Sequence, residues 1–140
     1  MYKLDGDFNC MNNPHLKSLK GCPDIVDDFS CAHTGIQSLE HGPKIVSGYY
    51  GCYSTSIVNL RGAPKHIGWG FDCSDTNILD FIGGPEVVGG DFICVDCLFL
   101  KSLEGFPKEV KGYVNIRHSG LRVSETDIRK ICKVGGSIYV

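Results

Sequence analysis

The 140-residue sequence has no run of twenty apolar residues, and Met1 to Asp5 lack the apolar segment of a signal peptide. We therefore expect a soluble protein that stays in the cytoplasm where it is made, without membrane contact. The net charge is only −2 and no block of basic residues occurs, so nucleic acid is not expected as a partner. No charge run or low-complexity tract marks a linker, which predicts one domain over residues 1–140.

One pattern, an aromatic residue followed two positions later by a cysteine, recurs through most of the chain. The cysteines of this pattern are 21 residues apart: Cys10, Cys31, Cys52, Cys73 and Cys94. A period of this length is typical of a solenoid, because one such unit cannot bury its apolar side without neighbours above and below. The pattern therefore predicts stacked coils, and a function on a surface rather than in a pocket.

The rest of each unit repeats as well. Each cysteine is followed by two spaced apolar residues, then by a Gly-Pro corner, then by an aliphatic residue that re-enters the core, as Val26 does in the first unit. We expect five full repeats from about residue 6 to 111, and a C-terminal capping region over about 112–140. Within that region Ser124 and Asp127 predict the start of a short helix with Ile128, Ile131 and Cys132 as its apolar stripe, Gly135 ends it, and Val140 is expected in the core.

The eight cysteines are interpreted as packing residues. The repeat column that contains five of them also contains Ile116 and Val140, and a free cysteine packs as a small apolar side chain. Stacked disulfides or a metal site remain the alternative, although the only C-x-x-C, Cys94 and Cys97, lacks a partner pair. Cys97 shares a column with residues that can form a hydrogen-bonded ladder: Asn13, Thr34, Thr55, Thr76 and Ser119. No metal or cofactor is expected, and a reducing compartment is inferred.

The repeat text resembles the leucine-rich-repeat consensus, with Phe and Cys in place of two leucines. The segments Leu16 to Val26 and Leu100 to Val110 are similar to the Leu-x-Ser-Leu-Glu-Gly-x-Pro repeats of short proteins from tailed bacteriophages and bacteria, and to repeats of secreted bacterial effectors. This resemblance implies an α/β repeat: a leucine-rich-repeat solenoid with a parallel sheet of about seven strands on its concave face, Gly-Pro corners on the convex face, and one short C-terminal helix. It implies binding rather than catalysis, and we expect no enzyme.

Side chains that flank the buried aromatic residues and cysteines should point outward on the concave sheet. The residue types at those positions differ from repeat to repeat, whereas those at the core positions stay nearly constant. Packing therefore does not fix them, and they are free to suit a binding partner. The predicted partner-binding residues are Asp28, Tyr49, Tyr53, Asp72, Asp91, Ile93, Val95, Tyr113 and Arg117. The acidic members favour a partner with a basic surface, with simple solubility as the alternative, and Trp69 either covers a corner or meets a partner.

The expected function is therefore that of a binding module, and specifically a phage-encoded inhibitor of a host protein such as a defence enzyme, acting in the bacterial cytoplasm. The alternative is a structural or assembly role. The first strand is expected to lack a cap, so that Phe8 and Cys10 are candidates for self-association, unless Lys3, Asp5 and Asp7 discourage it by charge.

Overall fold

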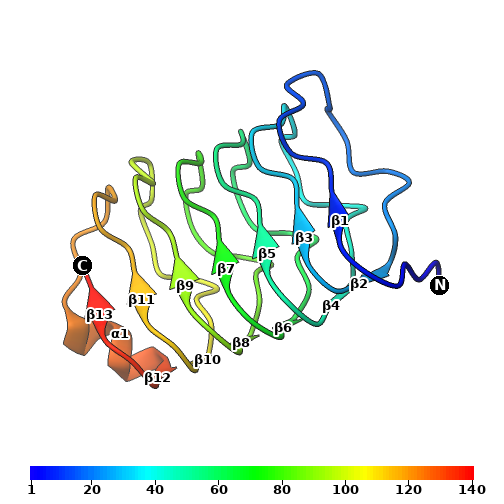
Figure 1. The fold of residues 1–140 in the computed structure, drawn as a ribbon. Helices are drawn as coiled ribbons and strands as arrows, with labels where there is room; N and C mark the ends of the chain where they lie inside the picture. The colour runs from blue at the N-terminus through cyan, green and yellow to red at the C-terminus, as the bar shows by residue number, and fades with distance from the viewer.

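A computed structural model describes residues 1–140 and shows a parallel β-solenoid. Each turn of the solenoid, here called a coil, contributes one two-residue strand to each of two sheets. Figure 1 shows the coils side by side, with β1 at one end and β13 and the helix at the other. The larger sheet has the order β1(Phe8–Asn9), β3(Phe29–Ser30), β5(Tyr50–Gly51), β7(Phe71–Asp72), β9(Phe92–Ile93), β11(Val114–Asn115), β13(Ile138–Tyr139).

The register of the larger sheet follows the repeat. Phe8 pairs with Phe29, Tyr50 with Phe71, and Val114 with Ile138, so equivalent positions of successive coils lie side by side. The predicted parallel sheet of seven strands is confirmed.

The second sheet was not predicted. It runs along the side expected to hold only Gly-Pro corners, and its six strands are β2(Ile25–Val26), β4(Ile45–Val46), β6(His66–Ile67), β8(Val87–Val88), β10(Glu109–Val110) and β12(Lys133–Val134). These strands begin two residues after the corner proline in the first coils, as Ile25 does after Pro23. Stacking of equivalent coils brings identical extended backbones together, and their N–H and C=O groups then pair along the whole solenoid.

The core lies between the two sheets and is built from the predicted columns. The rings of Phe29, Tyr50, Phe71 and Phe92 are fully buried, with successive centroids 4.8 to 5.6 Å apart. The cysteines of the next column, Cys31, Cys52, Cys73 and Cys94, are also fully buried and free. The packing interpretation of the cysteine column is therefore confirmed in these four coils, whereas Cys10, with a neighbour on one side only, is half-buried.

The helix α1(Glu125–Ile131) forms where Ser124 and Asp127 predicted it. The Ser124 hydroxyl accepts the N–H of Asp127, and the Asp127 carboxylate accepts the N–H of Ser124, which is a capping box. Ile128 and Cys132 are buried as expected. With seven residues, the helix is too short to cross a bilayer, and no helix long and apolar enough for that is present.

Three details of the C-terminal prediction are wrong. Ile131 is 48% exposed, because the short helix buries a single row of side chains against the coil. Gly135 does not end the helix: Cys132 is already extended, and β12 comes before Gly135. Val140 occupies the cysteine column but is 53% exposed, since no coil stacks over it. Column position predicts the direction of a side chain, whereas burial also requires a neighbour on both sides.

Candidate functional site

The outward residues of the seven-stranded sheet form one surface, called the sheet face below. Three columns build it: the residue before each buried aromatic position, the residue between the aromatic residue and the cysteine, and the residue after the cysteine. All nine predicted partner-binding residues belong to these columns, on β5 to β11 and in the coil of β3. Eight of the nine lie beside β5, β7, β9 and β11, which are neighbours in the sheet, so the structure brings them together.

Two positions expected to point outward are buried instead. Gly51 lies beneath the ring of Tyr49, since a Cβ at Gly51 would come within 2.7 Å of Tyr49 Cε1 and Oη. Ala32, between the longer side chains of Met11 and Tyr53 in its column, is 0% exposed. A small residue on a sheet face is covered by its large neighbours, so period-two alternation alone overestimates its exposure.

Tyr49 and Tyr53 form the aromatic part of the sheet face. Tyr49 lies over Gly51 and is only partly exposed; burial raises the pKa of its hydroxyl, and the nearby Asp72 carboxylate and Tyr53 raise it further. Tyr53 is also partly exposed and meets the His33 ring edge-on, with centroids 5.4 Å apart. These tyrosines therefore offer ring surfaces already held in place by the sheet, which lowers the entropy lost on binding.

The aspartates of the sheet face have a structural role that sequence reasoning missed. In the first column, Asp7 accepts the N–H of Asp28 at 3.0 Å, and Asp28 accepts that of Tyr49 at 2.7 Å. Asp91 accepts the N–H of Tyr113 at 2.9 Å in the same way. Each carboxylate thus satisfies a backbone donor of the following coil. Acidic character in this column consequently has a cause other than a basic partner.

Side chains of the second column accept the backbone N–H of the residue two positions further along the chain. Asp72 accepts the N–H of Ser74 at 2.9 Å, and Asn9, Ser30 and Asn115 make the same bond to the residue two positions on. The recurrence of Asn, Ser and Asp at this position is the signal that could have revealed the turn. One oxygen of each of Asp28, Asp72 and Asp91 accepts these bonds, and the other oxygen has no protein donor.

A second aromatic group occupies the C-terminal part of the sheet face. The Arg117 guanidinium lies 4.7 Å from the centre of the Tyr139 ring, and Tyr113 meets Tyr139 edge-on at 5.8 Å. Tyr139 was not among the predicted residues, although it occupies the same column as Asp72, Ile93 and Asn115. Ile93 and Val95 on the β9 coil lie between the two aromatic groups and are partly exposed. An apolar and aromatic strip thus runs from Tyr49 to Tyr139, interrupted at the β7 coil, whose outward residues are Gly70, Asp72 and Ser74.

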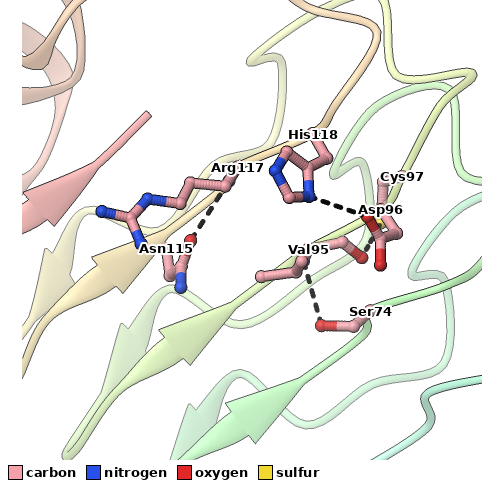
Figure 2. A network of polar contacts seen from close by, with 7 residues as sticks. All are labelled: Ser74, Val95, Asp96, Cys97, Asn115, Arg117 and His118. Atoms are coloured by element: carbon pink, nitrogen blue, oxygen red, sulfur yellow. Dashed lines mark hydrogen bonds and ion pairs between the residues drawn. The ribbon is translucent and has the colours of Figure 1, made fainter.

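A row of left-handed residues borders the sheet face at the ends of its strands. These residues, two positions after each of the five column cysteines and after Ile116, have φ values of 51° to 61°: Asn12, His33, Ser54, Asp75, Asp96 and His118. The Ser54 hydroxyl donates to Asp75 at 2.8 Å. His118 Nδ1 lies 3.1 Å from Asp96 Oδ1, and Figure 2 shows this contact. This polar border was not predicted, although Asn, Asp and His are the non-glycine residues most often found with such a backbone.

The remaining predicted residues lie at the first strand and at a corner. Phe8 stacks on Phe29 at 6.2 Å and, like Cys10, is partly exposed, because β1 pairs only with β3. A shallow hollow of about 210 Å³ opens there, lined by Asp7, Asn9, Asp28 and Tyr49 among others. Trp69 is 73% exposed, so it does not cover the corner.

A scan against models of known protein families gives no match for this chain. Searches of curated proteins and of solved structures give no match either.

Proposed function

We propose that the protein binds another protein through the sheet face. The observation that supports this most is the apolar and aromatic strip from Tyr49 and Tyr53, across Ile93 and Val95, to Tyr139. It lies on a sheet whose backbone groups are paired in every coil, and a polar border flanks it. Partly desolvated aromatic side chains surrounded by polar residues are the usual composition of energetic centres in protein interfaces.

We further propose that the partner presents a basic surface. The second carboxylate oxygens of Asp28, Asp72 and Asp91 accept no bond from the protein itself. Arg117, the one cation among the candidate residues, is engaged with the Tyr139 ring. The sheet face therefore offers carboxylates and few cations. A lysine or arginine of a partner would gain charge-assisted hydrogen bonds there, and association would weaken with salt.

The biological role that we propose is inhibition of another protein. The repeat text resembles leucine-rich repeats of phage and bacterial proteins, and on that resemblance we propose a phage-encoded inhibitor. Its target would be a host protein, such as a defence enzyme, blocked stoichiometrically in the bacterial cytoplasm. In this role the sheet face covers the target surface, and no catalytic group of the chain is required.

The experiment compares matched variants in affinity capture from bacterial lysate, followed by titration of the purified partner. Tyr49→Ala combined with Tyr53→Ala removes one aromatic group of the sheet face. Leu98→Ala combined with Phe99→Ala removes two side chains that are 65% and 58% exposed but lie beyond the polar border. We expect the first pair to weaken binding at least tenfold, and the second to leave it unchanged. Equal recovery of the same partner by both double variants would contradict the proposal.

A second candidate function is assembly through the edge of β1. The observation in its favour is that β1 has a neighbour on one side only, with Phe8 partly exposed next to it. Light scattering over a range of concentrations, with Phe8→Asp as the variant, tests this function. A parent protein that stays monomeric throughout would exclude it.

A further inference from the structure

The fifth coil carries two sulfurs where the three coils before it carry one sulfur and one hydroxyl. In three earlier coils a buried threonine donates to the carbonyl of the column cysteine: Thr34 to Cys31, Thr55 to Cys52 and Thr76 to Cys73, at 2.7 to 2.9 Å. In the fifth coil Cys97 takes the threonine position. Its Sγ lies 2.8 Å from Cys94 Sγ, 3.4 Å from the carbonyl oxygen of Cys73 and 3.6 Å from Thr76 Oγ1.

The fold already holds these two sulfurs in contact. Cys94 and Cys97 are three residues apart, and the chain turns back between them at Asp96, which has a φ of 59°. Column cysteines of successive coils are all free. The Cys94 thiol also interacts with Cys73 of the preceding coil, but its contact with Cys97 lies within one coil. To form a bond, the Cys94 and Cys97 sulfurs would have to approach from 2.8 Å to about 2.05 Å.

The surroundings of the two thiols also shift their pKa values in opposite directions. The Cys94 thiol donates to Cys97, and this bond, helped by the Thr76 hydroxyl, lowers the pKa of Cys97 below its ordinary value although burial opposes the effect. Burial raises the pKa of Cys94 and of the neighbouring column residues Cys52 and Cys73. Cys97 is consequently the thiol with the greatest thiolate character in the core, and the thiolate is the reactive form.

We propose that Cys94 and Cys97 form a reversible dithiol–disulfide couple whose oxidant is a small peroxide. The Cys97 thiolate attacks one oxygen of hydrogen peroxide, the O–O bond breaks, and a sulfenic acid and hydroxide form. The Cys94 sulfur then attacks the Cys97 sulfur, the S–O bond breaks, and water leaves. Overall, two thiols and one hydrogen peroxide give one disulfide and two waters. A thiol reductant returns two electrons and two protons and restores the pair.

Size restricts the oxidant. Cys94 and Cys97 are both 0% exposed, so a bulky disulfide cannot reach them in the folded protein. The turn that joins them is itself at the surface, however, since Asp96 is exposed and Leu98 is 65% exposed. Hydrogen peroxide is close to water in size and needs only local opening of the turn.

Oxidation would reach the sheet face through Val95. This residue lies between the two cysteines; its carbonyl oxygen is 3.8 Å from Cys97 Sγ, and its N–H donates to Ser74 Oγ (Figure 2). The carboxylate of Asp96, the next residue, lies within hydrogen-bond distance of the His118 ring. Closing the disulfide moves these contacts, so oxidation would change the middle of the apolar strip. This effect on binding rests on the proposed function, whereas formation of the bond does not.

The test counts thiols and needs no partner. The reduced full chain is treated with hydrogen peroxide, unfolded, alkylated with iodoacetamide and weighed by mass spectrometry. The untreated chain carries eight alkylated cysteines. We expect oxidation to leave two thiols fewer, with one bridged peptide containing Cys94 and Cys97. Dithiothreitol added to the unfolded, oxidised chain should restore all eight thiols. Loss of other thiols first, or no loss until urea unfolds the protein, would overturn the proposal.

Cys97→Thr is the matched control, because it converts the fifth coil to the arrangement of the three coils before it. We expect this variant to fold, with an unchanged circular dichroism spectrum and cooperative melting. Its thiol count should stay the same before and after peroxide treatment. If Cys97→Thr still loses two thiols under the conditions that oxidise the parent, the couple lies elsewhere and the proposal is wrong.

Discussion

Asp28 accepts the backbone N–H of Tyr49 at 2.7 Å, across the gap between the coils of β3 and β5. Gly48, the residue before Tyr49, leaves room for this carboxylate, since a Cβ at Gly48 would collide with it. The same relation joins Asp91 to Tyr113, with Gly112 in the place of Gly48. One side chain thus serves both as a support for the sheet and as a negative charge on its face, and substitution can separate the two roles.

Asp28→Ala should destabilise the protein by about 1 kcal/mol, because the Tyr49 N–H loses its acceptor. Asp28→Asn keeps a carbonyl oxygen at that position and should retain most of this stability while removing the charge. Urea unfolding followed by circular dichroism measures both differences. Equal destabilisation by both variants would show that charge, rather than the hydrogen bond, supports the coil. In binding experiments, the Asn variant then reports the contribution of the charge alone.

Tyr50→Phe should stabilise the protein by roughly 1 kcal/mol. The Tyr50 hydroxyl is buried without a hydrogen-bond partner, in a column that otherwise carries Phe29, Phe71 and Phe92. Removing it therefore relieves an unsatisfied donor and keeps the stacked ring. The urea midpoint of the variant should rise. Phe71→Tyr, which adds a hydroxyl one coil later, is the matched control and should lower the midpoint. A less stable Tyr50→Phe would indicate that the hydroxyl has a partner, such as a buried water.

The buried columns could be predicted from sequence because each is defined by many copies. Phe29 and Phe92, or Cys31 and Cys94, recur at one spacing, and equivalent positions of a solenoid must stack. The start of α1 could be predicted for a different reason: Ser124 and Asp127 carry the whole capping signal within four residues. Both predictions depend on information that is either repeated or local.

The features that escaped prediction depend on neighbours in other coils. The second sheet exists through pairing between coils: β6(His66–Ile67), for example, pairs with β4 on one side and β8 on the other. Exposure of Val140 and burial of Gly51 depend on what lies over each residue, and that is set by a different coil or by a large adjacent side chain. The acceptor role of Asp28 was missed for the same reason, since its partner lies 21 residues away. Candidate residues of the sheet face could be placed, but their contacts could not.

Asp127→Ala should make the protein less sensitive to acid. The bonds with the Ser124 backbone and side chain lower the pKa of Asp127 below its ordinary value of 3.8. A lowered pKa means that the folded state favours the carboxylate, so its contribution to stability is present above the unfolded pKa and disappears as the pH falls through the folded pKa. The stability difference between parent and variant should therefore be present at about pH 6 and shrink as the pH falls below about 4. Urea midpoints at both values measure it. A difference that stays constant with pH would contradict a role for the ionised carboxylate.

Gly62→Ala should destabilise the solenoid by about 2 kcal/mol or more. Gly62 has a φ of +97°, and a Cβ there would come within 2.5 Å of the Glu40 N and of the Leu39 carbonyl group in the preceding coil. Both the backbone conformation and the stacking distance thus exclude a side chain. His41 is the informative control: it takes the equivalent corner with a φ of 69°, so His41→Ala retains a Cβ that this coil already accommodates. We expect His41→Ala to change the urea midpoint far less than Gly62→Ala does. Similar losses in the two variants would mean that the corner tolerates a Cβ equally in both coils, and that the distance between neighbouring coils does not limit it.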